Sequence, residues 1–238
     1  MTDFALTYDD VTLVPEYSEI RSRQDPDPSC DLMGIKLSSP IVSANMDTIT
    51  ESMMAIAMWN AGGIGVLHRF MDIEKNCREY QIVKRADAEC MNSLGTKDWE
   101  ERTSRLFAIG ARHFVIDIAH GHSVLVKEML MGLREKYGDQ IKIMAGNVAT
   151  AGAVHAMKRW GADAVKVGVG GGSICTTRVI TGFGVPMFTS VLECAREART
   201  CGIQVVADGG IRTSGDIVKA FVAGADAVMI GRLLAGVE

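Results

Sequence analysis

The chain has 238 residues, of which 25 are lysine or arginine and 29 are aspartate or glutamate, so its formal net charge is -4. This slightly acidic balance, without a basic run, argues against a surface for nucleic acid or anionic membranes. No apolar stretch reaches the roughly 18–20 residues of a membrane span, whereas the 47% of hydrophobic residues suits the core of one α/β barrel of about 200–250 residues.

Neither a signal peptide nor a metal-binding cysteine pattern is visible. The first residues contain no basic segment followed by an apolar one, and the six cysteines form no CxxC pair and no zinc-type spacing with histidine. His120 and His122, which flank Gly121, also have no third ligand at metal spacing. We therefore expect a cytoplasmic protein with reduced, mostly buried thiols and no zinc site.

Strand and helix patterns alternate along the chain at intervals of about 20–30 residues. After an irregular arm over residues 1–39, the β-branched runs predict eight strands at Pro40–Ala44, Gly63–Leu67, Cys90–Leu94, His113–Ile118, Ile141–Ala145, Ala164–Val167, Gln204–Ala207 and Ala227–Ile230. Amphipathic stretches predict seven helices at Glu51–Ala61, Ile73–Arg85, Asp98–Ile109, Val124–Tyr137, Ala151–Trp160, Val191–Thr200 and Ser214–Ala223.

The alternation of strands and helices favours a TIM (β/α)8 barrel over an open doubly wound sheet. Two segments with nearly the same sequence, Trp160–Gly168 and Ala223–Gly231, indicate that one βα unit is used twice. We expect residues 1–238 to form a single barrel domain with its N-terminal arm and without a regulatory insert.

The segment after the sixth predicted strand carries the strongest chemical signal, because active sites of such barrels lie at the carboxyl ends of the strands. Four glycines fall within Gly168–Gly172, so backbone amides can approach an anion and backbone carbonyls a cation. Ser173 could add a hydroxyl to a phosphate. Cys175, followed by Arg178, lies where positive potential would favour the nucleophilic thiolate. The alternative is an inert buried cysteine in a glycine-rich turn.

Other strand ends supply further candidates. Asp208 precedes Gly209 and Gly210 and could accept hydrogen bonds from vicinal sugar hydroxyls, or only cap a turn. Those glycines and Gly231 leave room for a phosphate on backbone amides. Arg232 is either a phosphate ligand or a surface charge.

Two strand ends earlier in the chain leave two interpretations open. Asp117 could hold a second ribose or orient a cofactor, or could cap the next helix. His68 and Arg69 could receive an anion or form a salt-bridged barrel rim.

These motifs together resemble one family. Gly170–Arg178 is similar to the active-site loop of the IMP dehydrogenase/GMP reductase family, and Asn45–Thr48, Asp208–Arg212 and Leu234–Gly236 match its other signatures. The resemblance runs from Leu6 to Glu238.

Within the family, several positions look more like the reductase branch. These are Asn45 before Met46, the loop Asp117–Ser123, and His68–Phe70 with Thr181–Gly184. The short distance between Phe70 and Gly95 leaves no room for the regulatory domains that most dehydrogenases carry there. The resemblance therefore implies GMP reductase, an oxidoreductase of purine metabolism that deaminates GMP to IMP and ammonia with NADPH.

The resemblance also implies roles for single residues. Cys175 would attack C2 of guanine to give a thioimidate, and Thr177 would help activate the leaving amine. The implied ligands are Ser173, Gly210 and Gly231 for the 5′-phosphate, Asp208 for ribose, Asn45 and Met46 for the base, Asp117, Ala119 and Asn147 for the cofactor, and the carbonyls of Gly170, Gly172 and Cys175 for potassium. Gly209 and Arg232 are further candidates for substrate binding.

Three other functions stay open at this point. They are IMP dehydrogenase, which converts IMP to XMP with NAD; a shortened nucleotide-binding relative without turnover; and a flavin-binding barrel. The resemblance implies a homotetramer. It also leads us to expect a barrel without the flap and final helix of the family, and Gly171 stands where the family usually has proline.

Overall fold

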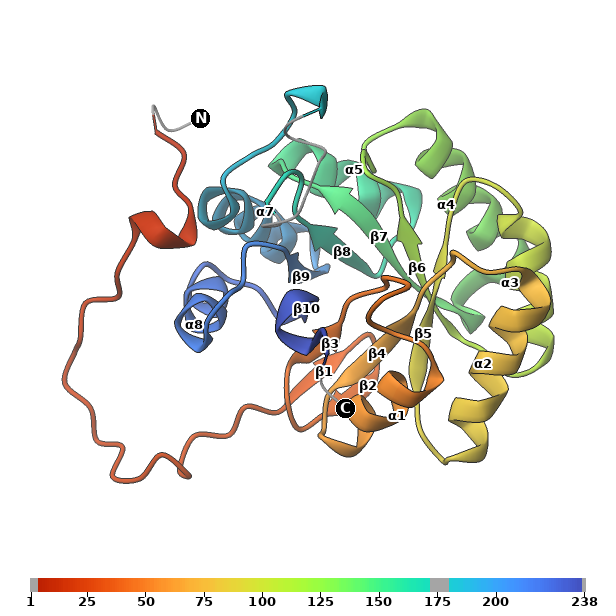
Figure 1. The fold of residues 1–238 in the computed structure, drawn as a ribbon. Coiled ribbons are helices and arrows are strands. Elements are labelled where there is room, and N and C mark those ends of the chain that lie inside the picture. Colours follow the sequence, from red (N-terminus) through yellow and green to blue (C-terminus); the bar gives the residue numbers. More distant parts are fainter. Residues whose placement is uncertain (1–3, 172–179, 237–238) are drawn as a thin grey trace.

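Eight parallel strands close into a barrel in the computed structural model, which describes residues 4–171 and 180–236 (Figure 1). Around the barrel the order is β10-β3-β4-β5-β6-β7-β8-β9. The strands are β3 (Ile41–Ser43), β4 (Ile64–Leu67), β5 (Cys90–Leu94), β6 (His113–Asp117), β7 (Lys142–Val148), β8 (Ala164–Val167), β9 (Gln204–Asp208) and β10 (Ala227–Ile230). All eight overlap their predicted ranges, so the TIM barrel is confirmed, but β7 runs past its predicted end at Ala145 and contains Asn147, which the sequence places in the following loop.

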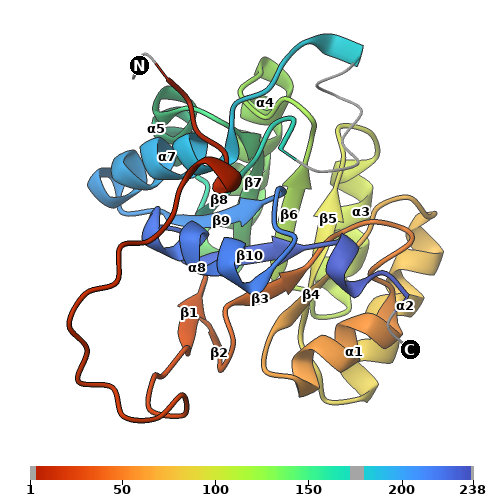
Figure 2. The same cartoon turned by 60° about the vertical axis from the view of Figure 1, so that its left-hand side comes forward.

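Helices cover the outside of this barrel (Figures 1 and 2). Within the described ranges they are α1 (Ser52–Asn60), α2 (Ile73–Arg85), α3 (Trp99–Ala108), α4 (Val124–Tyr137), α5 (Ala151–Trp160), α7 (Met187–Cys201) and α8 (Ser214–Val222). Helix α7 begins four residues before its predicted start, directly after Pro186, whose ring fixes a backbone angle compatible with helix entry. No helix in this part of the chain combines the length and apolar character of a membrane span.

The N-terminal arm contains structure that the sequence patterns do not predict. After a short 3-10 turn (Tyr8–Asp10), β1 (Cys30–Leu32) and β2 (Ile35–Leu37) pair as an antiparallel hairpin. Its two turn residues, Met33 and Gly34, both have positive φ, which is the geometry of the tightest hairpin turns. Residues 12–29 are exposed and run well clear of the barrel (Figure 1).

The hairpin closes the amino end of the barrel. Leu32 and Leu37 are buried in the same cluster as the side chains that fill the barrel interior, among them Val42, Ile64 and Met91. A second, larger cluster lies between the strands and the helices. The carboxyl ends of the strands are therefore the end of the barrel where polar side chains are available for chemistry.

Candidate active site

A buried lysine links two aspartates at the carboxyl ends of the strands. Lys166 of β8 is only 2% exposed, and its Nζ lies 3.2 Å from Asp117 Oδ1 of β6 and 2.5 Å from Asp208 Oδ2 of β9. Strand β7 separates β6 from β8, and Gly146 is the β7 residue in register with both Asp117 and Lys166. A Cβ on Gly146 would lie 2.7 Å from that of Lys166. The absence of a side chain on Gly146 therefore leaves room for the Lys166 side chain to extend past β7 to Asp117.

The charged side chains of this group stabilise one another. Burial alone would lower the pKa of Lys166, but the two carboxylates outweigh it and raise that pKa, so the ammonium stays protonated. Burial alone would raise the pKa of Asp117. The positive charges of Lys166 and Arg69 and a hydrogen bond from Asn45 outweigh burial and lower this pKa below its ordinary value. Both groups are therefore ionised at neutral pH.

Asn147 of β7 joins this group and keeps one atom free for a ligand. Its Nδ2 donates to Gly168 O at 2.7 Å and to Asp208 Oδ2 at 2.9 Å. Its Oδ1 is buried and has no hydrogen-bond partner among the residues that the structure describes. A buried, unsatisfied acceptor is costly, so the site fits a ligand with an N–H donor. We call Asp117, Asn147, Lys166 and Asp208 the strand-end centre.

Gly168 allows strands β8 and β9 to approach each other closely beside this centre. It has φ of +153°, and a Cβ there would lie 1.9 Å from the carbonyl oxygen of Asp208. No other residue type permits this approach without moving β8 away from β9.

Two cavities lie beside the strand-end centre and share Gly184 and Val185 in their walls. The first, of about 260 Å³, is lined by Gly170 and Gly210 and is bordered by Tyr8 of the N-terminal arm. The second, of about 510 Å³ and mainly apolar, is lined by Ala119, Asn147 and Phe183, among others. The candidate phosphate glycine Gly210 and two of the candidate cofactor residues thus line separate spaces.

The remaining substrate candidates are brought together only in part. Asn45 is 6% exposed at the end of β3 and hydrogen-bonds Asp117. A Cβ on Gly231 would lie 3.5 Å from Met46 Sδ, so those two residues are neighbours. Gly209, with φ of +110°, and Gly210, with +75°, form the turn after Asp208. Arg232 is exposed at the start of the 3-10 turn Arg232–Leu234, and nothing places it in the centre.

Four predicted residues lie outside the described residues. They are Gly172, Ser173, Cys175 and Thr177. The assignment of nucleophile and of two potassium ligands therefore stays a prediction.

Sequence reasoning missed Lys166 although a signal for it exists. The two repeated segments align Lys166 with Met229 of β10, so a charge replaces an apolar residue inside an otherwise apolar strand. His68 and Arg69, adjacent in sequence, contact different carboxylates. His68 Nε2 lies 3.1 Å from Glu51 Oε1 at the rim, whereas Arg69 Nε lies 3.6 Å from Asp117 Oδ2.

The sequence profile of the IMP dehydrogenase / GMP reductase domain matches residues 5–238. The chain is 36% identical to inosine-5'-monophosphate dehydrogenase of Cryptosporidium parvum, over 98% of this chain and 68% of that protein. It is 35% identical to the protein of the same name from Borreliella burgdorferi, over 100% and 71%, and 34% identical to that from Staphylococcus haemolyticus, over 98% and 74%.

The prediction of a GMP reductase is wrong, because these curated relatives are all named IMP dehydrogenase. The lack of an insert between Phe70 and Gly95 does not distinguish a reductase from a dehydrogenase. The Cryptosporidium alignment spans 275 positions and the Staphylococcus alignment 363, so proteins named IMP dehydrogenase differ widely in their extra segments. The reductase-like residues are a handful of loop positions and do not outweigh similarity along the whole chain. The family is one of purine nucleotide oxidoreductases that use a nicotinamide cofactor, and NADPH in particular has no support.

Proposed function

Because the chain belongs to the IMP dehydrogenase/GMP reductase family, we propose that it acts as an IMP dehydrogenase, which oxidises IMP to XMP with NAD⁺. The observation that carries the proposal is the similarity to proteins named IMP dehydrogenase over 98–100% of this chain. The strand-end centre supports it, since it offers paired carboxylates beside two cavities.

The proposed chemistry needs a nucleophile and a water molecule. Cys175 would form a bond to C2 of the purine as the C2 hydride leaves, and NAD⁺, when bound, accepts that hydride. Water would then add to C2 and release the thiol of Cys175 with XMP. The sum is IMP, NAD⁺ and water giving XMP, NADH and a proton. The thiolate is the reactive form of the cysteine.

The ribose of IMP would be held by Asp208. Its side chain is 22% exposed, and Lys166 and Asn147 both donate to its Oδ2, so the carboxylate is oriented before a ligand arrives. The base would lie against Met46, near Asn45. The phosphate would be held by backbone amides of Gly209, Gly210 and Gly231 with the Ser173 hydroxyl. The positive φ of Gly209 and Gly210 and the lack of a side chain at all three glycines allow close approach.

The cofactor would occupy the larger, apolar cavity. Ala119 and Asn147 line it, and the free Oδ1 of Asn147 is an acceptor for a carboxamide N–H of the nicotinamide. Asp117 would act beside it as a carboxylate already fixed by Lys166. Carbonyls of Gly170, Gly172 and Cys175 are proposed to hold a potassium ion near the loop, and Thr177 to assist the chemistry.

The test is turnover of the full chain with IMP and NAD⁺, followed by NADH absorbance and by chromatography of XMP. We expect both products in equal amounts, and none from Cys175→Ser. Cys30→Ser, which alters a half-buried cysteine in β1, is the matched control and should keep the parent rate. Equal NADH formation by Cys175→Ser and the parent, or tight IMP binding without any XMP, would refute the proposal.

A further inference from the structure

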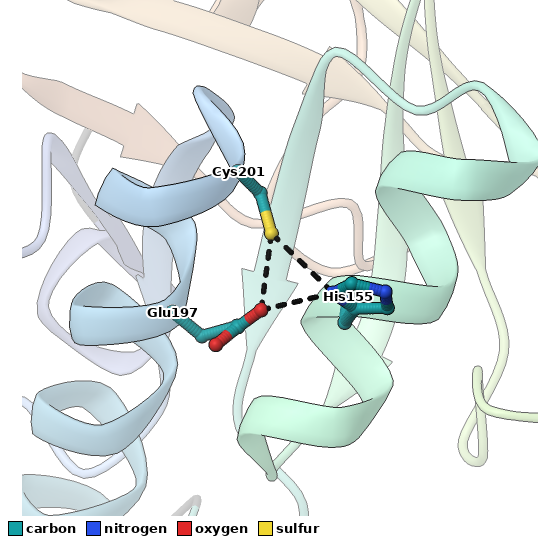
Figure 3. Close-up of side chains that lie close together, drawn as sticks. All are labelled: His155, Glu197 and Cys201. Carbon is teal, nitrogen blue, oxygen red and sulfur yellow. Dashed lines mark hydrogen bonds and ion pairs between the residues drawn. The ribbon is translucent and has the colours of Figure 1, made fainter.

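Three side chains that are typical metal ligands converge on the outside of the barrel. His155 projects from α5, and Glu197 and Cys201 project from α7 (Figure 3). Glu197 and Cys201 are one helical turn apart, so they share a face of α7. Helices α5 and α7 pack against each other. Within residues 4–171 and 180–236, this is the one group of three or more such side chains with ligand atoms this close.

The donor atoms form a triangle of the size that a zinc ion requires. His155 Nδ1 lies 3.0 Å from Glu197 Oε1, Cys201 Sγ lies 3.1 Å from the same oxygen, and Sγ lies 3.8 Å from Nδ1. Tetrahedral zinc with ordinary bond lengths separates sulfur from a lighter donor by about 3.5 Å and two lighter donors by about 3.3 Å. Shifts of a few tenths of an ångström would therefore complete the coordination.

We propose that His155, Glu197 and Cys201, called here the helix-face cluster, bind one zinc-type divalent cation that bridges α5 and α7. The donor set of thiolate, imidazole and carboxylate is one that zinc accepts and that magnesium or calcium does not. The fourth position would be taken by water, since the His155 side chain is 56% exposed. The site is separate from the proposed redox chemistry and does not depend on it.

In the absence of a metal ion, hydrogen bonds hold the three side chains of the helix-face cluster together. Because the thiol of Cys201 donates to Glu197, the pKa of that thiol is raised and the pKa of the carboxyl is lowered. A zinc ion replaces the thiol proton and releases it to solvent.

The surroundings favour a stable bridge. Lys158 of α5 donates to the carbonyl of Gly202 at the end of α7 at 3.0 Å, so the two helices are already tied one turn from the cluster. Helix α7 follows directly on Gly184 and Val185, which line both cavities of the active site. An ion on the cluster would therefore restrain the helix to which the active-site loop leads.

The experiment measures zinc binding to the full chain by competition with a chromophoric chelator. Cys175→Ser is present in every protein so that the proposed nucleophile cannot bind the metal. We expect one zinc ion per chain, at least about 100-fold weaker binding after Cys201→Ser or His155→Ala, and no more than about twofold change after the matched controls Cys30→Ser and Glu193→Gln. Glu193 lies one turn before Glu197 on α7.

Cobalt substitution gives an independent readout. With Co²⁺, the parent should show the strong visible bands of tetrahedral cobalt and a thiolate charge-transfer band, and Cys201→Ser should lose the latter. Circular dichroism checks that each variant is folded. No stoichiometric zinc binding by the parent, a loss below about tenfold in Cys201→Ser, or a charge-transfer band that survives that substitution would each overturn the proposal.

Discussion

The strand-end centre and the helix-face cluster are both small groups of charged or titratable side chains, but they are built differently. In the strand-end centre, the closed barrel fixes the backbone, and Lys166 is buried between two carboxylates that neutralise it. In the helix-face cluster, the side chains come from two helix surfaces, and His155 faces solvent. The strand-end centre should therefore stabilise the folded chain by itself, whereas the helix-face cluster should stabilise it only when its ligand is bound.

Removing the central charge of the strand-end centre should have the largest effect. Lys166→Met leaves the half-buried carboxyl groups of Asp117 and Asp208 without the cation that lies between them. We expect the free energy of unfolding to fall by about 3–5 kcal/mol, the usual cost of breaking a buried ion pair from one side. Urea unfolding at neutral pH measures it, and IMP oxidation should be lost with it.

The pH dependence of this variant provides its control. In the parent, the pKa of Asp117 is lowered on folding, so its contribution is present above the ordinary carboxyl pKa and is lost as pH falls through the lowered one. Without Lys166, burial should raise that pKa, so acidification favours the folded variant. The difference in unfolding free energy between parent and variant should shrink below about pH 4; a constant difference would show that charge pairing is not the cause.

Gly168→Ala tests the backbone of the same centre. The new Cβ would meet the carbonyl of Asp208 at 1.9 Å, so β8 and β9 must separate, and we expect a loss of about 2–4 kcal/mol in unfolding free energy. Gly152→Ala is the matched control: it lies in α5 with open space at the Cβ position and should stabilise the protein by about 0.5 kcal/mol. Thermal or urea unfolding that gives both variants the same stability would contradict this role of Gly168.

Asn147→Ala should have a smaller effect on stability and a selective effect on function. It removes hydrogen bonds to Asp208 and to Gly168, at a cost of about 1–2 kcal/mol. If Asn147 faces the nicotinamide, KM for NAD⁺ should rise about tenfold while KM for IMP changes less. Steady-state kinetics with each substrate varied in turn measures the split, and a larger effect on IMP would place Asn147 on the substrate side instead.

The two regions also differ in how far sequence predicts them. Strands and most helix bounds follow from local periodicity, and Asp117, Asn147 and Asp208 are found because a parallel barrel brings its strand ends together. Lys166 was missed because an inward-facing lysine in an apolar strand has no motif of its own. The hairpin Cys30–Leu37 was missed because its strands have only three residues each.

The helix-face cluster is invisible to spacing rules for a different reason. Glu197 and Cys201 have a regular interval, but His155 lies 42 residues before Glu197 and meets it only because α5 and α7 pack together. Sequence spacing detects metal sites whose ligands share one short segment. The expectation of no zinc site rests on such spacing alone, and the proposed site between two helices departs from it.

Cys201→Ser should have the smallest effect of all in metal-free protein, and this sharpens the contrast between the two regions. The serine hydroxyl can still donate to Glu197, and the cluster lies at the surface, so we expect the unfolding free energy to change by less than about 0.5 kcal/mol in the presence of a chelator. Added zinc should then raise the thermal midpoint of the parent and leave that of the variant unchanged, because only a ligand bound to the folded state stabilises it. Thermal unfolding with and without zinc measures both. A large loss of stability in the chelated variant would mean that the hydrogen bonds of the cluster hold α5 against α7 without a metal ion. The cluster would then stabilise the fold by itself, as the ion pairs of the strand-end centre are expected to do.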